Sequence, residues 1–474
     1  MLHYIYQNLE EFQKSFSRSS TWLLFCSIVI GFMGTGEMIG VTSLCRFWLL
    51  DEAGYYRLLH FFRSKAYVYG ELLNAWQDFV AKQDQSVKVA GRTVLIGDHT
   101  AAVKDGRKMP GVVSMHESSE TQSKPSYFRG QCWGSIGVLI GSLSGCFCCP
   151  LQLQIHQGWA HLGLTEEVLS QCRIKLTDRL VAMAIHFAAT NNCLCYLVLD
   201  AFFSTGGVFR ACNYYSILHK ERWVEVLVKA KNSYVGYFLA PPKPASQPGR
   251  QALYGEKVCL AECFDHLHLF ETVSCQVYGK TESIRVMTLT LLWRPIADQV
   301  LFILAVTSKG PIVLMSSDLT LSAVNAVELY CARTRIEIMF SALKHLIGAF
   351  KFRFWTKKLP KHSRRPFSNR KLKSPLPEDI STVQACWQAY ETFVLCASIA
   401  LGLLQLIALN YQDTIWSEHQ LYLRTQSRDL PSEKTVKQML APLILKQFFR
   451  LEENGIIQQI RTSFMTVSDE IDDD

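Results

Sequence analysis

The sequence predicts an α/β protein in which a mixed sheet is flanked by helices, with a β-rich insertion and helical N- and C-terminal regions. Three observations lead to this prediction. Apolar runs of strand length alternate with helical patterns between residues 89 and 240. Residues 241–311 carry alternating patterns typical of strands. Residues 1–88 and 379–450 carry mainly helical patterns.

The first strands of the predicted sheet lie on either side of a polar loop. Thr93–Gly97 is a short apolar run that we expect to end at Asp98, before the turn-rich stretch "AAVKDGRKMPGV". The stretch "GQCWGSIGVLIGSLSGCFCCPLQLQI" indicates two buried strands joined around Ser142–Gly145. Three antiparallel strands at the start of an α/β pattern favour a mixed sheet.

Helices and strands then alternate up to the insertion. The stretch "LTEEVLSQCRIKLTDRLVAMAIHFAA" has apolar residues at helical spacing, and "CLCYLVLDAFF" is an apolar strand ending at Asp200. A helix over about 205–220 and a strand in "WVEVLVKAK" follow. After the insertion, "PIVLMSSD" predicts one more strand. Ser322 or Thr320 is placed to cap the long helix behind it.

Composition places the chain of 474 residues among large globular proteins. Hydrophobic residues make up 49%, which permits a large core and excludes global disorder. The N-terminus has no basic region followed by an apolar core, so we expect no signal peptide and a cytoplasmic protein. The sixteen cysteines are then expected to be reduced and buried, because their spacing does not favour a structural zinc site.

Three apolar runs raise the question of a membrane span: Trp22–Met33, Ile136–Leu153 and Phe393–Leu409. The first is too short, and the second is interrupted by serines and Pro150. The third has 17 residues without a charge, at the lower limit for a span, and suits a buried helix equally well. We interpret all three as core and expect no membrane contact.

Two acidic residues stand at the ends of predicted strands. Asp98 follows "VLIG" and Asp200 follows "YLVL". An aspartate at the carboxyl end of a buried strand points toward the edge where α/β sheets bind ligands. For either residue alone, a helix cap or a turn is the simpler interpretation.

A third carboxylate belongs to a helix that carries a mixed polar face. Tyr330, Arg333, Glu337 and Lys344 stand at offsets of 0, 3, 7 and 14, which places them within an arc of roughly 60° on an ideal helix. A solvated face is one explanation. Together with Asp98 and Asp200, Glu337 would instead complete a set of three carboxylates able to hold two divalent cations about 3.5–4 Å apart.

On these residues the chain resembles the DDE transposases of bacterial insertion sequences, in particular the insertion-sequence-four group. The signature of that group is Tyr-x2-Arg-x3-Glu-x6-Lys, and this sequence matches it at every spacing. The resemblance covers about residues 90–350 well, 380–410 loosely and 1–88 only by position.

The resemblance implies a ribonuclease H-like catalytic domain whose Asp98, Asp200 and Glu337 are catalytic residues and ligands of two Mg²⁺ ions, with Mn²⁺ as a substitute. It also implies Mg²⁺-dependent cleavage at transposon ends and joining of the 3′ ends to target DNA. Tyr330, Arg333 and Lys344 would bind DNA. The partners implied are double-stranded DNA, both transposon ends and target, and further copies of the chain in a homodimer or higher multimer.

The domain boundaries follow from these patterns. We expect the catalytic domain in two parts with the insertion between them, a basic linker, and helical regions at both ends. The ranges are 1–88 for a DNA-binding helical region, 89–240 and 312–350 for the catalytic domain, 241–311 for the insertion, 351–378 for the linker, and 379–474 for the C-terminal region with its acidic tail.

The basic segment 351–373 carries ten Lys and Arg, no acidic residue and four aromatic residues. A solvated linker is the usual explanation for such a run. The interleaved aromatic residues favour nucleic acid, because cations neutralise phosphates while rings stack on bases. The aromatic residues are Phe352, Phe354, Trp355 and Phe367.

Further candidates have simpler explanations. His99 adjoins Asp98 and could touch metal or DNA, but we expect it to pack or hydrogen-bond locally. Trp293 in the insertion is expected to be core. Asp318 is expected to cap a helix rather than support the site. A loop holding Lys104, Arg107 and Lys108 is as compatible with solvation as with DNA contact. Two alternatives to a transposase stay open: a non-catalytic DNA-binding relative and a nuclease of the same fold.

Overall fold

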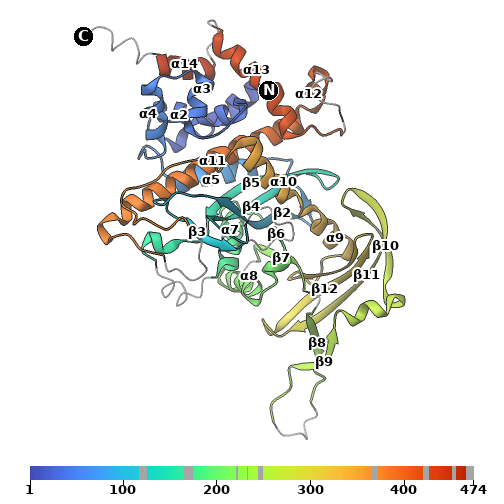
Figure 1. Ribbon diagram of the computed structural model, residues 1–474. Helices are drawn as coiled ribbons and strands as arrows, with labels where there is room; N and C mark the ends of the chain where they lie inside the picture. Colours follow the sequence, from blue (N-terminus) through green and yellow to red (C-terminus); the bar gives the residue numbers. More distant parts are fainter. Residues whose placement is uncertain are drawn as a thin grey trace, which may run out of the picture.

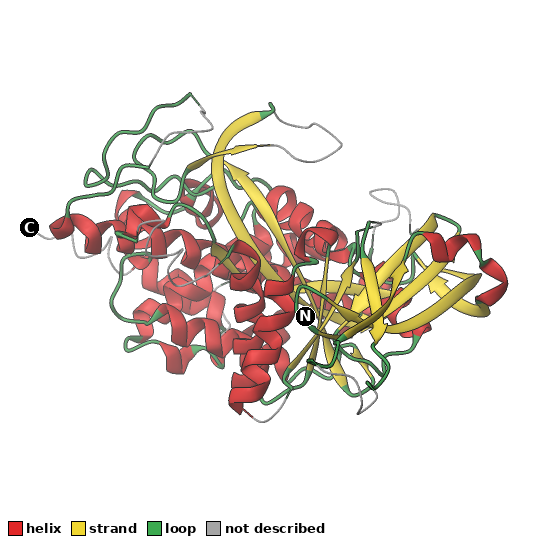
Figure 2. Cartoon of the chain, turned by 90° about the horizontal axis from the view of Figure 1, so that it is seen from below, coloured by secondary structure: helices red, strands yellow, loops and turns green. Residues whose placement is uncertain are grey.

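The computed structural model describes residues 1–116, 125–164, 175–219, 222–231, 233–243, 249–365, 372–419, 426, 428–450 and 455–465. Helices from the two ends of the chain gather at one end of the molecule, and the strands of the insertion lie at the other (Figure 1). Seen from below, the same separation of helices from insertion strands is visible (Figure 2). The expected acidic tail lies outside the described residues.

One sheet runs through the described part of the chain, in the order β3-β4-β2-β6-β7-β13-β12-β11-β8-β9, with β1, β5 and β10 attached to β2, β4 and β11. The strands are β1 (Lys88–Val89), β2 (Arg92–Val103), β3 (Val113–His116), β4 (Tyr127–Ser142), β5 (Gly145–Ile155), β6 (Cys195–Leu199), β7 (Val224–Lys229), β8 (Val235–Leu239), β9 (Tyr254–Cys259), β10 (Glu271–Val277), β11 (Lys280–Trp293), β12 (Asp298–Thr307) and β13 (Gly310–Ser316). The prediction of a mixed sheet flanked by helices is confirmed.

The centre of the sheet combines antiparallel and parallel pairing. Strand β4 pairs antiparallel with both β5 and β2, whereas β2, β6 and β7 are parallel neighbours. The parallel strands are connected through α7 (Leu176–Thr190) and α8 (Gly206–His219). These strands are buried on both faces, which explains their continuous apolar sequences.

The prediction that the first strand ends at Asp98 is wrong. Strand β2 continues to Val103, because residues 98–103 stay paired with β4 after the parallel pairing with β6 ends at Ile96. Asp98 therefore lies where β2 loses one neighbour and keeps the other. The polar stretch behind it begins only after Val103.

Helices cover the two faces of the sheet around β2. A Cβ atom built on Gly97 would lie 2.4 Å from Leu180 of α7, whereas the side chain of Asp98 contacts Arg333. Because successive strand residues point to opposite faces, α7 and the segment around Arg333 lie on opposite sides of the sheet. Helix α11 (Ile380–Asn410) packs against β5 beside α10 (Arg335–Ser341).

The long helix predicted around Glu337 is broken. Helix α9 (Ala323–Ala332) begins at Ser322, whose side chain accepts a hydrogen bond from the Asn325 amide, as expected for a cap. It ends before α10, and a π-helical turn, η6 (Ala342–Ile347), follows. At the break the hydroxyl of Thr334 donates to the Cys331 carbonyl at 3.0 Å, which competes with helical bonding.

The helices at the two ends of the chain form one packed group. Helix α2 (Ser19–Gly34) contacts α3 (Val41–Trp48), α4 (Glu52–Phe61), α11, α13 (Glu433–Phe449) and α14 (Ile456–Met465). The remaining helices are α1 (Leu2–Glu10), α5 (Tyr69–Ala81) and α12 (Gln412–Glu418), and the single-turn helices are η1 (Gln13–Ser15), η2 (Trp159–Leu162), η3 (Ala201–Phe203), η4 (Glu262–Asp265), η5 (Leu267–Leu269) and η7 (Pro377–Asp379).

All three apolar runs are largely buried, as expected of core segments. Within the described ranges one helix, α11 with the preceding turn, is long and apolar enough to cross a membrane. Its most apolar window is 94% buried against the rest of the protein, which is the environment of a core helix.

Candidate active site

Asp98 and Asp200 occupy equivalent positions on neighbouring strands. The parallel register pairs Ile96 of β2 with Val198 of β6, and the same offset of 102 residues joins Asp98 to Asp200 (198 − 96 = 200 − 98). Asp200 directly follows β6, and its carboxylate accepts a hydrogen bond from the Ala201 amide at 2.7 Å. The expectation that β6 ends at Asp200 is confirmed.

Arg333 connects the carboxylates. Its guanidinium donates to Asp98 Oδ2 at 3.2 Å and to Glu337 Oε1 at 2.8 Å. The break between α9 and α10 places Arg333 at the turn, where the Arg333 amide bonds to Tyr330 and the Ile336 amide bonds back to Arg333. The Arg333 side chain is 10% exposed, whereas that of Glu337 is 59% exposed. The Arg333–Asp98 pair is thus shielded from water, and Glu337 stands at the rim.

The other two signature residues lie on the same side of the sheet. Tyr330 contacts Asp200, and burial together with the Asp200 charge raises the pKa of the Tyr330 phenol. Lys344 donates to Thr100 Oγ1 at 2.6 Å, and Thr100 follows Asp98 by two residues on β2. The structure therefore brings Tyr330 to Asp200 and Arg333 to Asp98, leaves Glu337 paired with Arg333 at the rim, and places Lys344 farther along β2.

The electrostatics of the site are those of a shielded carboxylate pair. Burial raises the pKa of Asp98 to about 6, the Asp200 charge adds to the rise, and Arg333 and the His99 amide oppose it. Burial alone would lower the pKa of Arg333, but the charges of Asp98, Asp200, Tyr330 and Glu337 raise it instead. The guanidinium is thus the local counter-charge of the cluster.

The donor set around Asp98 and Asp200 fits Mg²⁺ in part. Two carboxylates near each other supply the hard oxygen ligands that Mg²⁺ prefers, and a magnesium site needs only one or two of them beside water and substrate phosphate. Glu337 is paired with Arg333 instead of joining the aspartates. Across the residues that the structure describes, no three His, Cys, Asp or Glu side chains form a ready-made metal cluster.

His99 packs and hydrogen-bonds as expected, but its partner is distant in the sequence and not local. Its Nε2 lies 3.0 Å from Nδ1 of His156, and its ring stacks on Phe203. Burial lowers the pKa of His99 to about 4 and that of His156 to about 3, so both rings are neutral near pH 7. His99 follows Asp98 on β2, so its side chain points to the opposite face of the sheet, and the pair lies on the side that α7 covers. His156 lies more than fifty residues away in sequence, and no local signal linked the two.

Tyr278 is a second residue that sequence patterns did not single out. It forms the turn between β10 and β11 with a φ of 49°, and its side chain is 51% exposed. Its phenol pKa is raised by burial, then by the nearby Cys331 and Glu337, with Arg333 opposing them. The insertion therefore reaches back to the rim of the site.

The remaining candidates have structural roles. Trp293 is buried against Phe209 and Tyr234, so the expectation of core packing is confirmed. The expectation that Asp318 caps a helix is wrong, because Ser322 is the cap and Asp318 accepts hydrogen bonds from Tyr196 and Thr320.

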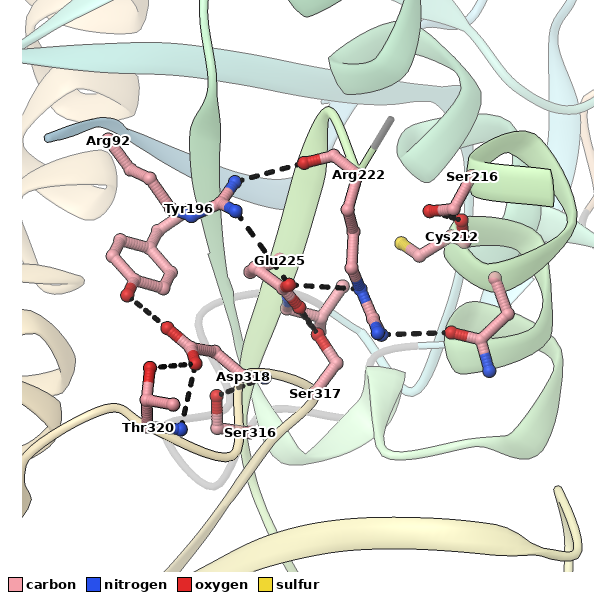
Figure 3. A network of polar contacts seen from close by, with 12 residues as sticks. Arg92, Tyr196, Cys212, Ser216, Arg222, Glu225, Ser316, Ser317, Asp318 and Thr320 are labelled. Atoms are coloured by element: carbon pink, nitrogen blue, oxygen red, sulfur yellow. Dashed lines mark hydrogen bonds and ion pairs between the residues drawn. The ribbon is translucent and has the colours of Figure 1, made fainter. Parts of the chain in front are cut away.

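Asp318 belongs to a polar network around β7 (Figure 3). Because β13 runs antiparallel to β7 and β7 runs parallel to β6, this network lies at the opposite ends of the strands from Asp98 and Asp200. Glu225 is its centre: it pairs with Arg222 at 2.9 Å and accepts a hydrogen bond from Ser317. Burial raises the pKa of Glu225, and Arg222 opposes the rise. The network joins β7 to the end of β13, where the chain returns from the insertion.

In comparisons with known proteins, no protein-family model matches this chain and no curated protein sequence matches it.

Proposed function

We propose that this protein is a DDE-type transposase, which cleaves DNA at transposon ends and joins the 3′ ends to target DNA. The observation that carries the proposal is the contact of Arg333, from the signature helix, with Asp98, whose register partner on the next strand is Asp200. Residues that the sequence placed 235 positions apart meet in one shielded cluster. A solvated helix face would not require that meeting.

The fold supports the proposal. The order β5-β4-β2-β6-β7, with two antiparallel strands added on one side of β2 and two parallel strands on the other, is compatible with a ribonuclease H-like domain, which we propose for this part of the chain. Both aspartates then stand at the carboxyl-terminal side of the parallel pairing, where such sheets bind ligands.

Each residue has a role that suits its chemistry. Asp98 and Asp200 would hold Mg²⁺, with Glu337 as the third ligand, and the ions would activate the attacking oxygen and stabilise the leaving one. Arg333 neutralises the carboxylates before substrate binds and has the fork geometry to hold a phosphate. Tyr330 contacts Asp200. Lys344 is held at Thr100, and we propose that its ammonium binds a phosphate of the DNA backbone.

The test compares two carboxylate-to-amide variants on labelled duplexes that carry the element's own ends. Asp200→Asn keeps an oxygen that can accept from the Ala201 amide, so the local fold is retained while a metal ligand is lost. Asp298→Asn removes an exposed carboxylate at the start of β12 and is the matched control.

We expect Mg²⁺-dependent nicking and strand joining by the wild type and by Asp298→Asn, and neither reaction by Asp200→Asn. Nicking without joining would make the protein a nuclease of the same fold. Tight binding with no cutting by any of the three proteins would identify a non-catalytic DNA-binding relative.

A further inference from the structure

The segment after η6 is a fixed strap. Residues 351–365, called the strap here, form neither helix nor strand, yet their backbone is held at several points by basic side chains from the loop that follows β2. Lys104 Nζ donates to the carbonyls of Phe350 and Phe352 at 2.6 and 2.8 Å. Its ammonium also lies 3.7 Å from the centre of the Phe352 ring.

The hold continues along the strap. Lys108 donates to the Lys357 carbonyl at 3.0 Å, and Arg107 donates to the His362 carbonyl at 3.1 Å. Backbone hydrogen bonds add to this, because the Thr356 and His362 amides donate to the carbonyls of Lys108 and Arg107. The loop cations that could have been solvated or bound to DNA are thus engaged with the strap backbone.

The aromatic side chains of the strap are mostly packed against the protein, whereas its basic side chains are mostly exposed. Phe352 is buried and stacks on Tyr390 with ring centroids 4.6 Å apart, and Phe354 packs against Phe62 and Phe393. The expectation that these two rings stack on bases is therefore wrong, and Phe367 lies outside the described residues. The exposed side chains are mostly basic: Lys351, Arg353, Lys357, Lys358, Lys361, Arg364 and Arg365, together with Trp355 at 54% exposure.

The strap is attached to the same strand, β2, that carries Asp98 of the candidate active site, but beyond the end of that strand. Along β2, Asp98 is followed by Thr100, which binds Lys344, and then by Lys104, which binds the strap. Lys104 lies six residues beyond Asp98, a span of about 20 Å in an extended strand. Because B-DNA rises about 3.4 Å per base pair, that span corresponds to about six base pairs.

We propose that the exposed basic side chains of the strap bind the phosphate backbone of a DNA duplex about six base pairs from the cleaved phosphate. The inference rests on the proposed function. A backbone fixed by the buried Lys104 and by Arg107 and Lys108 holds its cations in place without substrate, so binding orders few new residues. Lysine and arginine contacts of this kind recognise phosphate and carry no base sequence.

The experiment uses two triple variants of equal charge change in the full-length chain. Lys351→Gln, Arg353→Gln and Lys357→Gln remove exposed strap charges without touching the carbonyls that the anchors hold. The matched control replaces three exposed lysines, Lys257, Lys434 and Lys446, with Gln, and all three lie outside the strap and outside residues 1–88. The measurements are the dependence of DNA affinity on salt, and cleavage of duplexes whose flanking arm grows from two to about twelve base pairs.

We expect the wild type and the control to cleave the duplex faster once its flanking arm exceeds about six base pairs. The cleavage rate of the strap variant should not depend on the length of the arm. The slope of log affinity against log salt should fall by about 2 to 3 in the strap variant alone. Equal slopes and equal arm dependence in all three proteins would overturn the proposal. So would loss of binding to anionic vesicles with an unchanged DNA slope.

Absence of cleavage in every protein would count against the proposed function, and the salt slopes would still decide the role of the strap.

Discussion

Three buried charged side chains show how this fold handles charge at the level of single residues. Arg333 is shielded but pairs with two carboxylates, and Lys104 pairs with two carbonyls and a ring. Burial lowers the pKa of Lys104 to about 7, so its charge is marginal near neutral pH. Among the described residues no cation pairs with Glu391 of α11, which accepts hydrogen bonds from the Ile155 amide and Trp387 Nε1. Burying a charged side chain that has no oppositely charged partner lowers the free energy of unfolding more than burying a paired one.

Glu391 should therefore make stability depend on pH. Burial raises its pKa from 4.5 to about 7, against the two hydrogen bonds. Between these values the folded state binds more protons than the unfolded state, so the free energy of unfolding falls as pH rises through this window. Glu391→Gln keeps both acceptor contacts without a charge, and we expect it to stabilise the protein by up to about 3 kcal/mol above pH 7.

Denaturant unfolding at pH 5 and pH 8 measures this effect. The gain from Glu391→Gln should be present at pH 8 and small at pH 5. A gain of equal size at both values would show that the carboxyl is ionised throughout.

At the scale of elements, periodicity was enough to place most strands and helices, because those of the central sheet are buried on one or both faces. Periodicity was not enough where pairing with a distant strand, or a side-chain hydrogen bond to the backbone, decides where an element ends. Strand β2 runs past Asp98 because β4 continues to pair with it. The signature helix breaks at Arg333 and Thr334, where the Thr334 hydroxyl donates to the Cys331 carbonyl. The carboxylates and signature residues were predictable from spacing, whereas the His99–His156 pair and Tyr278 depend on contacts between distant segments.

The packing of α7 on β2 gives an element-scale prediction. A Cβ atom on Gly97 would lie 2.4 Å from Leu180 Cδ2 and 2.8 Å from Leu199 Cδ2, so Gly97→Ala must displace these two side chains or widen the space between α7 and the sheet. Overpacking of this kind costs about 1–3 kcal/mol. Because Asp98 is the next residue, we also expect cleavage to fall more steeply than stability.

Gly70→Ala is the control for this change. A Cβ atom there meets nothing within 4 Å, and the residue lies in α5, so the variant should be neutral or slightly stabilised. Thermal unfolding and cleavage assays on both variants decide the matter. A Gly97→Ala protein with normal stability and activity would mean that the interface between α7 and the sheet yields easily.

At the scale of the whole molecule, the helices of the two chain ends pack against the central sheet and its helices. Trp76 of α5 is fully buried, and its Nε1 donates to the Pro150 carbonyl of β5 at 2.8 Å. Lys437 of α13 donates to the carbonyls of Phe32 in α2 and Leu346 in η6, both at 2.9 Å. Contacts of this kind tie the ends of the chain to the elements that position Arg333 and Glu337. The N-terminal helices are thus part of the structural support of the site.

Trp76→Ala tests whether these parts unfold as one unit. Loss of a buried tryptophan costs about 3–5 kcal/mol. If the N-terminal helices and the sheet are cooperative, the variant should show a single transition at lower temperature, with helical circular dichroism and aromatic signals lost together. Trp355→Ala removes a ring that is 54% exposed and should leave the transition nearly unchanged. An early helical transition in Trp76→Ala, followed by a main transition at the wild-type temperature, would instead show that residues 1–88 fold independently of the sheet they cover.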